Sequence, residues 1–584
     1  MRNSKKHIVK QLAIAAALIG ITTLGFAASG SESASGAGKP KEPQYNIVFI
    51  IADDLGIRDL GITGSTFYET PNIDRLARNG MLFTDGYSAS PICTPARASI
   101  LTGQSPDRHG LTDWIGSRTG WDWWSVPEDV DNAAWREYRR NPDAGWQVPK
   151  MGARERMENH AMLAPEFPQE LRHSHTTIAE ALKEAGYVTH YSGKWHLGFK
   201  PEDRPEEHGF DTNKGGHGAG MPSNFFSPYK NPALEDGPDG EMLDIRLAEE
   251  TAKFIENHKN ERFFAFLSLY SPHTPVQCSR EKWEKYRAKA AKLGPLDRER
   301  HGSDEGFINR QVQDDPVYAG LIEHMDDAVG VVLAKLKELG LDKNTVVVFT
   351  SDNGGVSISS KYPFTSTLPF RGGKGQHYEG GVRVPFIVSA PGITKTGSTC
   401  ATPVSGVDFY PTFLEIAGAP LKPEQHADGI SLLPLLEGGV GDPDRALFWH
   451  YPHNHGAYSW RPASWIRSGN WKLVYSWNDG TEELFDLSKD IGERNNLVQV
   501  EKAKASELRD KLFERLMETK ARVPSPNPFW NPEKTAALWK STYAERKQVS
   551  EEIAREMLNP DWEPSGRKGW GPWWGSGRNN EQQK

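Results

Sequence analysis

Short apolar runs that stop abruptly at polar residues recur along the chain. The run from Ile47 to Ile51 is apolar throughout and rich in β-branched residues, which is typical of a strand buried on both faces. Similar runs lead into Lys194, His273 and Asp352, and a further apolar run reads VPFIVSAPG. Together these runs predict the strands of one buried sheet.

Helical patterns separate the predicted strands. Thr177 and Glu180 have the spacing of a capping box ahead of IAEALKEAG, and Gly186 is placed to end that helix. A longer apolar stripe with helical spacing runs from Leu321 to Leu336. The alternation predicts an α/β fold with a mostly parallel sheet sandwiched by helices. The carboxyl ends of such strands open onto one crevice, so we expect the polar residues that follow them to converge there.

The pattern changes after about residue 440. Three segments, RALFWHYP, SWIRSGNWKLVYSW and EELFDLSKD, predict a small antiparallel sheet, and KASELRDKLFERLMETK predicts one amphipathic helix. We therefore expect a main domain over residues 45–440, a C-terminal subdomain over 441–524, and a tail over 525–584 that is rich in Trp, Pro and Gly.

The amino-terminal segment has the pattern of a secretory signal peptide. Basic residues precede an apolar stretch that ends in small residues. This pattern predicts a signal peptide over residues 1–28, a flexible lead-in over 29–44, and export to the periplasm or the medium. A retained membrane anchor is the alternative, but the apolar stretch is short for a membrane span, so no membrane association is expected after cleavage.

Charge and cysteine content limit the partners and the disulfide bonds that we expect. The net charge of -8 argues against nucleic acid as the main partner. The 584 residues include three cysteines, Cys93, Cys278 and Cys400. In an oxidising compartment Cys278 and Cys400 are the possible disulfide pair, which leaves Cys93 without a partner.

Two pairs of oxygen-bearing residues stand at predicted strand ends. Asp53 and Asp54 follow the first strand, and Asp352 and Asn353 follow a later one. Such side chains suit Ca²⁺, or Mg²⁺ as the second choice, better than zinc. Each pair alone would pass as turn residues. Because both pairs should open onto one crevice, they predict a cation site.

Lysines and histidines follow the same strand ends. Lys194 and His196 end YVTHYSGKWHLG, His273 lies in SPHTP, and Lys374 lies in the glycine-rich FRGGKGQHYEGG. A divalent cation together with these groups indicates an anionic substrate and stabilisation of charge at a transferring centre.

The motif PICTPARASILTG, with its Cys93-Thr94-Pro95-Ala96-Arg97 core, resembles the signature of the formylglycine-dependent sulfatases of the alkaline phosphatase superfamily. GYVTHYSGKWHLG is similar to the second signature of that family. NIVFIIADDLG, SPHTP, TSDNGG and RGGKG resemble its other motifs in the family's order, and DGISLLPLL and WIRSGNWKLVY resemble its C-terminal motifs. The resemblance extends from Tyr45 to about Pro524.

This resemblance implies an alkaline phosphatase-like fold and the hydrolysis of sulfate esters. It implies that a formylglycine-generating maturation enzyme oxidises Cys93 to an aldehyde whose hydrate attacks sulfur, which explains a cysteine without a disulfide partner. The implied metal ligands are Asp53, Asp54, Asp352, Asn353 and the modified Cys93. The other implied catalytic residues are Arg97, which stabilises the alkoxide, His196 as base, and Lys194, His273 and Lys374 around the sulfate, with His273 or Lys374 as general acid. Pro95 also suits the first turn of a helix beginning near Thr94, whose amino end favours an anion.

Aromatic and histidine-rich segments bear on the substrate. The segment from Asp113 to Pro168 is rich in Trp, as is the tail, and HYPHNHGAYSW places His450, His453 and His455 together. Aromatic faces suit sugars and cations suit further anionic groups, so we expect a sulfated oligo- or polysaccharide as substrate. The Trp residues could instead pack a loop shell or an oligomer interface.

Two alternative functions remain. One is a phosphonate or phosphodiester hydrolase of the same superfamily, and the other is a non-catalytic sugar-binding protein. The oligomeric state is left open.

Overall fold

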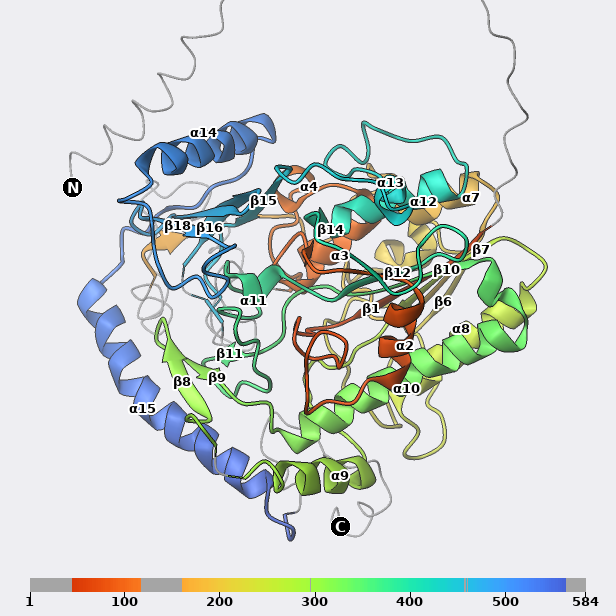
Figure 1. Ribbon diagram of the computed structural model, residues 1–584, viewed down its shortest axis with the longest axis horizontal. Coiled ribbons are helices and arrows are strands. Elements are labelled where there is room, and N and C mark those ends of the chain that lie inside the picture. Colours follow the sequence, from red (N-terminus) through yellow and green to blue (C-terminus); the bar gives the residue numbers. More distant parts are fainter. Residues whose placement is uncertain (1–44, 117–159, 295, 456–457, 460, 563–584) are drawn as a thin grey trace, which may run out of the picture. The chain divides into compact units, whose positions relative to one another are not determined.

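The computed structural model describes residues 45–116, 160–294, 296–455, 458–459 and 461–562, without the side chains of 538–542 (Figure 1). All of them fall within one compact unit. The predicted signal peptide at 1–28, the lead-in at 29–44, most of the Trp-rich segment and the end of the tail lie outside the described residues. The domain boundaries at 440 and 524 therefore stay predictions.

An eight-stranded sheet forms the centre of the main domain (Figure 1). β1 pairs in parallel with both β7 and β10, whereas β12 is antiparallel to its neighbours β10 and β2. The predicted α/β fold with a mostly parallel sheet is confirmed. In spatial order the strands are β13 (Ser398–Cys400), β2 (Met81–Phe83), β12 (Phe386–Ser389), β10 (Thr345–Ser351), β1 (Asn46–Ala52), β7 (Phe263–Ser268), β5 (Val188–Gly193) and β6 (Thr212–Lys214).

Helices cover both faces of this sheet, and β1 shows why its sequence is apolar throughout. Val48 and Ile50 face the core that is shared with α2 (Pro71–Asn79), α8 (Leu243–Asn257) and α10 (Pro316–Glu338). Ile47, Phe49 and Ile51 face the opposite core, which is shared with α3 (Cys93–Thr102), α7 (Ile178–Glu184) and α12 (Phe409–Ile416). Alternate side chains of one strand thus enter two separate cores.

Local sequence signals place several of these helices. Thr177 and Glu180 form the predicted capping box of α7, and Gly186 follows its end with a φ of +84°. Helix α3 begins at Cys93 with Pro95 in its first turn and ends at Gly103, whose φ is +67°. The helix therefore carries Cys93 at its amino end, as the sequence predicts.

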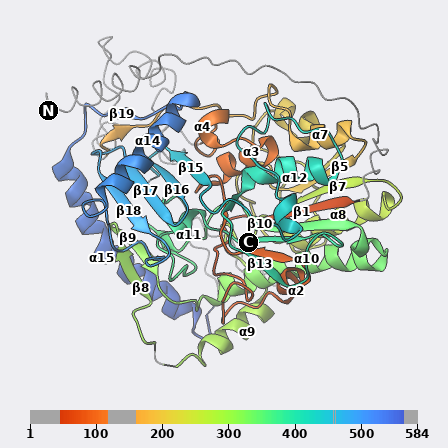
Figure 2. The same cartoon turned by 45° about the horizontal axis from the view of Figure 1, so that its top comes forward.

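The predicted antiparallel sheet lies at the C-terminal side of the chain. It consists of β15 (Ala446–Tyr451), β16 (Ala463–Ser468), β17 (Trp471–Ser476) and β18 (Glu482–Asp486) (Figure 2). One face packs on α14 (Lys502–Glu518) through Leu508 and Leu512. The other face contributes Trp449 and Trp465 to a cluster that also contains Cys93. The small sheet therefore backs the amino end of α3.

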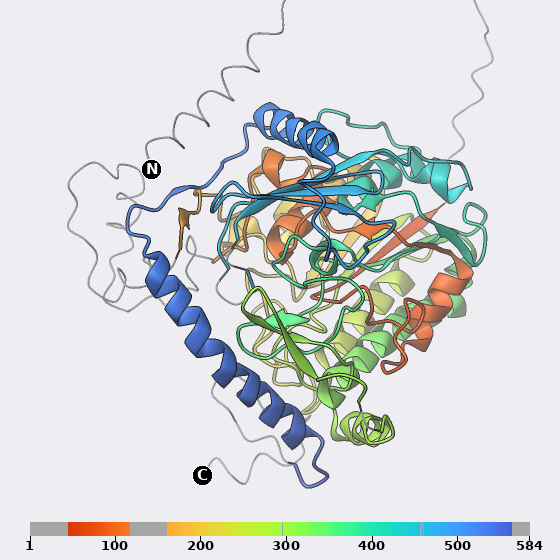
Figure 3. The same cartoon turned by 60° about the vertical axis from the view of Figure 1, so that its left-hand side comes forward.

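The tail contains a long helix that the sequence analysis does not predict. Strand β19 (Ser525–Pro526) pairs with β4 (Met162–Leu163), and α15 (Pro532–Met557) follows (Figure 3). The helix passes beside the hairpin of β8 (His301–Asp304) and β9 (Phe307–Arg310), where Glu551 Oε1 lies 2.8 Å from His301 Nδ1. Asn531 as cap and Pro532 at the first helical position are the start signals that the composition of the tail obscures. No helix in the described part of the chain combines the length and apolar character that a membrane crossing requires.

The possible pairing of Cys278 with Cys400 is not formed. Both residues are free cysteines. Cys278 is buried in the core beside α10, whereas Cys400 lies on the edge strand β13 and packs against the opposite core. Because the sheet separates the two residues, they cannot reach disulfide distance.

A buried ion cluster joins the small sheet to the main domain. Lys472 Nζ on β17 lies 3.0 Å from Glu379 Oε1 and 2.8 Å from Glu493 Oε1, and Glu379 starts the short helix α11 (Glu379–Val382). Burial raises the pKa of Glu493 to about 7. Burial acts in the same direction on Glu379, but Lys472 and Arg383 hold its pKa well below the usual range. Lys472 is thus the shared counter-charge of two buried carboxyls.

We expect Lys472→Met to lower the free energy of unfolding by about 3–5 kcal/mol, because it removes the cation beside Glu493 and leaves Glu379 paired with Arg383 alone. Lys489→Met is the matched control. Its side chain is 81% exposed and pairs with Asp486, so we expect a change below about 1 kcal/mol. Denaturant unfolding of both variants at neutral pH measures the difference, and equal small effects would contradict a structural role for the cluster.

Candidate active site

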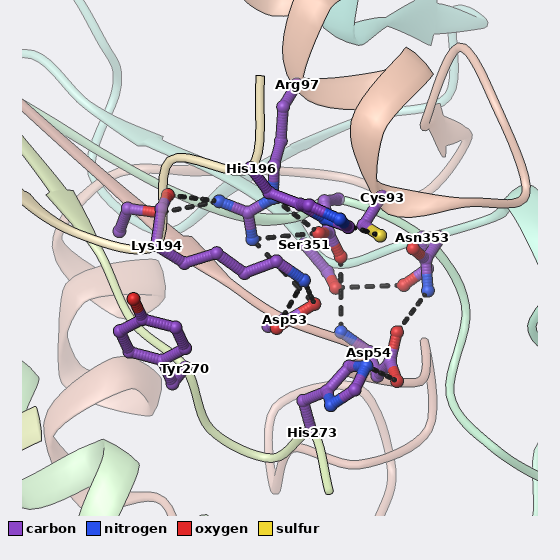
Figure 4. A network of polar contacts seen from close by, with 12 residues as sticks. Asp53, Asp54, Cys93, Arg97, Lys194, His196, Tyr270, His273, Ser351 and Asn353 are labelled. Atoms are coloured by element: carbon purple, nitrogen blue, oxygen red, sulfur yellow. Dashed lines mark hydrogen bonds and ion pairs between the residues drawn. The ribbon is translucent and has the colours of Figure 1, made fainter. Parts of the chain in front are cut away.

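Two neighbouring strands bring four oxygen-bearing side chains to one edge of the sheet. β1 and β10 run in parallel with Ala52 opposite Ser351. The residues that follow each strand, Asp53 and Asp54 after β1 and Asp352 and Asn353 after β10, are therefore adjacent (Figure 4). All four are buried.

Contacts within this group hold it in one arrangement. The Asp54 backbone N–H donates to Asp352 Oδ1 over 3.1 Å, and Asn353 Nδ2 donates to Asp54 Oδ1 over 2.8 Å. Asp54 has a φ of +66°, a strained conformation for a residue that carries a Cβ. Surrounding contacts must maintain this strain, and such residues cluster at functional sites.

Three buried cations match the three buried carboxylates. Lys194 Nζ lies 2.8 and 2.7 Å from the two carboxylate oxygens of Asp53, and Lys374 Nζ lies 2.7 Å from Asp54 Oδ2. Arg97 Nε donates to Asp352 Oδ2 over 2.8 Å. The fixed charges of these six residues sum to zero, so a bound divalent cation would give the site the positive charge that a sulfate ester requires.

Burial and these pairings shift the pKa values of the site. Burial raises the pKa of Asp53 well above its ordinary value, against the opposing effect of Lys194. Burial acts in the same direction on Asp54, but Lys374 and His273 outweigh it, so the pKa of Asp54 is lowered. Burial opposes the charge of Lys374, and Asp54 reverses that effect, so the pKa of Lys374 is raised. Lys374 therefore keeps its charge at neutral pH.

The thiol of Cys93 faces a histidine whose tautomer can be deduced. Cys93 Sγ lies 3.3 Å from His196 Nδ1, and His196 Nε2 lies 3.3 Å from the Ile115 carbonyl oxygen. A carbonyl only accepts, so Nε2 carries the hydrogen and Nδ1 presents its lone pair to residue 93. Burial, with Lys194 and Arg97 nearby, lowers the pKa of His196 well below its usual value. His196 is thus a neutral base aimed at position 93.

Backbone contacts that the sequence analysis misses hold His196 in place. Thr94 Oγ1 donates to the His196 carbonyl over 3.0 Å and accepts from the Ile115 N–H over 3.2 Å. Gly220 approaches the ring so closely that a Cβ there would lie 2.4 Å from His196 Cε1. The glycine-rich run GGHGAG at residues 215–220 is the sequence signal for this approach. No pattern in the sequence identifies the Ile115 carbonyl.

His273 is a second histidine of the site and contacts Asp54. Its Nε2 is 3.5 Å from Asp54 Oδ2, and its Nδ1 is 2.9 Å from the Thr274 carbonyl oxygen. Burial, together with Lys374, lowers the pKa of His273 to about 3. Asp53, Asp54 and His273 each offer one ligand atom, and these atoms lie within 4.8 Å of one another. His273 is therefore placed as a ligand candidate as well as a proton carrier.

The residues present fit a hard divalent cation. Three carboxylates converge, and the Oδ1 atom of Asn353 is buried without a hydrogen-bond partner. Carboxylate and amide oxygens are the donors that Ca²⁺ and Mg²⁺ prefer. Among the described residues, the group that could hold a metal contains no pair of cysteines, which zinc would favour. The orphaned oxygen of Asn353 is satisfied if it binds such a cation.

The three histidines of HYPHNHGAYSW occupy different places. His450 is buried on β15, with Nδ1 2.6 Å from Ser464 Oγ and Nε2 3.0 Å from the Arg522 carbonyl oxygen. His453 is buried with Nε2 2.8 Å from Thr112 Oγ1. Protein groups therefore engage both histidines.

His455 is the histidine of this segment that borders the site. Its ring centroid lies 4.7 Å from that of Tyr458 and 6.3 Å from that of Trp114. The Tyr458 ring lies 5.5 Å from Lys374 Nζ, and Trp114 packs against the cluster that contains Cys93. The other Trp residues of the segment from Asp113 to Pro168, from Trp121 to Trp146, lie outside the described residues.

Comparisons with known proteins agree with this geometry. The Sulfatase family model matches residues 45–132 and 148–419, and the model described as N-sulphoglucosamine sulphohydrolase, C-terminal, matches 373–522. The N-acetylgalactosamine-6-sulfatase of Mus musculus is 31% identical over 473 residues, which cover 77% of this chain and 75% of that protein. The steryl-sulfatase of Mus musculus is 28% identical over 597 residues, which cover 84% of each protein.

A solved structure shares the fold over most of the chain. The crystal structure of Ps i-CgsB in complex with k-i-k-neocarrahexaose superposes with a TM-score of 0.60 at 25% identity, covering 87% of this chain and 99% of that one. A buried set of carboxylates and cations, a cysteine at a helix amino end with a neutral histidine facing it, and a family model that matches more than half of the chain lead to one conclusion. The chain belongs to the sulfatase family and is a sulfuric ester hydrolase.

Proposed function

We propose that this enzyme removes sulfate from a sulfated carbohydrate, with a formylglycine made from Cys93 as its nucleophile and with a bound Ca²⁺ ion. The observation that carries the proposal is the position of Cys93 at the amino end of α3, 3.3 Å from the unprotonated Nδ1 of His196. That helix end favours an anion, and the buried Lys194 and Lys374 lie beside the same carboxylates. A sulfate ester is the anion that such a site stabilises.

The proposed groups supply chemistry that an unmodified cysteine lacks. The hydrated aldehyde would provide two hydroxyls at position 93. Asp53, Asp54, Asp352 and Asn353 would hold the divalent cation, which would lower the pKa of a hydroxyl. With both hydroxyls available, one is used for attack on sulfur and the other for expelling sulfate. A serine could not complete the second half of the cycle.

The residues of this chain have separable tasks in the cycle. His196 Nδ1 accepts the proton from the group at position 93, because its lone pair faces that residue and its Nε2–H is held by Ile115. Arg97 binds Asp352 and is held in turn by the Lys194 carbonyl over 3.0 Å, so its charge stays beside residue 93. Lys194 and Lys374 stabilise negative charge on sulfate oxygens. The proton for the leaving alcohol comes from Lys374, which keeps its charge at neutral pH, or from His273, whose lowered pKa means that it must first take up a proton.

The carbohydrate part of the proposal rests on the relatives and on the site border. The first mouse relative is, by name, an N-acetylgalactosamine-6-sulfatase, and the solved structure holds k-i-k-neocarrahexaose. In this chain His455, Tyr458 and Trp114 lie between the Cys93 cluster and Lys374. These ring systems suit a sugar next to the sulfate.

Export and maturation complete the proposal. The basic and apolar pattern over residues 2–28 supports a secretory signal peptide. Export to the periplasm or out of the cell is therefore part of the proposal. The Cys93-Thr94-Pro95-Ala96-Arg97 core supports recognition by a formylglycine-generating maturation enzyme. Amino-terminal sequencing of the exported protein tests the cleavage.

We expect Cys93→Ala to reduce turnover of 4-nitrophenyl sulfate by at least about 10³-fold, because the nucleophile is lost while the fold is kept. Cys400→Ala is the matched control, since Cys400 is a free thiol on an edge strand, and it should keep normal rates. Mass spectrometry of the Cys93 peptide from the wild type should show aldehyde in place of thiol. An active Cys93→Ala protein would refute the assignment.

Removal of divalent cations should abolish hydrolysis, and Ca²⁺ should restore it better than Mg²⁺. A thermal unfolding assay gives an independent readout. Free Ca²⁺ at about one hundred times its Kd stabilises the folded state by about 2.7 kcal/mol, and Asp54→Asn should lose this shift because Asp54 is a proposed ligand. Full activity after exhaustive chelation, or an equal Ca²⁺ shift in Asp54→Asn, would argue against the site.

The general acid can be identified with substrates whose leaving alcohols differ in pKa. If His273 is the acid, His273→Ala should lower the rate about 10²- to 10⁴-fold for sugar sulfates, whose alcohols need a proton, and much less for 4-nitrophenyl sulfate. Lys374→Ala should then lower the rates on sugar sulfates and on 4-nitrophenyl sulfate by a similar factor, because Lys374 would only stabilise charge on the sulfate. The reverse result would assign the acid to Lys374. A uniform loss in both variants would exclude both residues as the acid.

A further inference from the structure

Phe199 is an exposed aromatic residue beside the catalytic loop. Its side chain is 61% exposed although it lies three residues after His196. Leu197, between them, is buried. The exposed ring therefore leaves apolar surface available to a ligand beside the catalytic loop.

Two glycines hold the Phe199 ring in this exposed position. A Cβ at Gly218 would lie 2.6 Å from Phe199 Cδ1, and a Cβ at Gly116 would lie 3.3 Å from Phe199 Cζ. Gly116 has a φ of +82°, which favours glycine at that turn. The ring therefore rests against two backbone segments and keeps much of its surface in solvent.

Gly116 also links Phe199 to Trp114. The same Cβ at Gly116 would lie 3.7 Å from Trp114 Cζ3. Trp114 is partly buried and packs against the cluster that contains Cys93. Ile115 lies between Trp114 and Gly116 in the sequence, and its carbonyl oxygen accepts the hydrogen bond of the catalytic His196. The segment whose Ile115 carbonyl orients His196 therefore also carries Trp114. Phe199 lies on the loop that carries His196 itself.

The placement of the two rings indicates what they contact. Phe199 follows His196, the residue that contacts Cys93, by three positions, and Trp114 packs against the cluster that contains Cys93. Neither ring is charged, so neither suits the sulfate group itself. A flat apolar surface at that place suits the apolar face of a sugar ring. We propose that Phe199 and Trp114 form an aromatic rim that stacks on a pyranose ring of the leaving alcohol. This inference rests on the proposed carbohydrate substrate.

The experiment compares Phe199→Ala with Phe199→Tyr and the wild type. The probe is an N-acetylgalactosamine 6-sulfate oligosaccharide, and inorganic sulfate serves as a competitive inhibitor that has no ring. We expect Phe199→Ala to lower kcat/KM on the oligosaccharide about tenfold or more. The inhibition constant of inorganic sulfate, measured with 4-nitrophenyl sulfate, should change less than about twofold. Phe199→Tyr should keep kcat/KM near the wild-type value, because it keeps the ring.

Leu421→Ala is the control for loss of an exposed apolar side chain, since Leu421 is also exposed, and it should change neither quantity. A parallel rise in the inhibition constant in Phe199→Ala, or no recovery in Phe199→Tyr, would show that Phe199 only supports the catalytic loop and would overturn the inference. A wild type that cleaves 4-nitrophenyl sulfate but not the oligosaccharide would instead refute the carbohydrate assignment, and the inference with it.

Discussion

The site depends on burying three carboxylates at the ends of two adjacent parallel strands. Asp53, Asp54 and Asp352 are all withdrawn from solvent, and isolated buried charges of this kind are too costly to persist. Lys194, Lys374 and Arg97 offset that cost from three separate segments. These six charges balance one another, so a divalent cation bound among them would leave the site with the positive charge that favours a sulfate ester.

The C-terminal sheet is part of this arrangement rather than an appendage. Its inner face packs Trp449 and Trp465 into the cluster that contains Cys93, and Lys472 ties the sheet to Glu379 in the main domain. Trp449 Nε1 also donates to the Ser88 carbonyl, five residues before Cys93. Cys93, the proposed nucleophile position, is thus held from both sides, by α3 and by the small sheet, which is the rigidity that a precisely aligned reaction requires.

Proton chemistry at position 93 follows from a backbone contact. The Ile115 carbonyl fixes the tautomer of His196, and burial keeps the ring neutral. A neutral imidazole with a free Nδ1 lone pair can accept a proton, whereas an imidazolium could not. The segment of Ile115 joins the base to the aromatic residues at the site border, so acid–base chemistry and substrate contact share one short stretch of chain.

Local patterns of the sequence determined the sheet, the capped helix α7, the start of α3 and the polar residues that follow the strands, because these depend on periodicity and on residue chemistry near one position. They did not determine which partners the remaining side chains meet. His450 and His455 are five residues apart and equally suited to bind an anion, yet the former is held by Ser464 and Arg522 while the latter borders the pocket. The exposure of Phe199, the role of the Ile115 carbonyl, and the separation of Cys278 from Cys400 by the sheet likewise come from tertiary packing. Each depends on contacts between segments far apart in the chain, about which a local pattern carries no information.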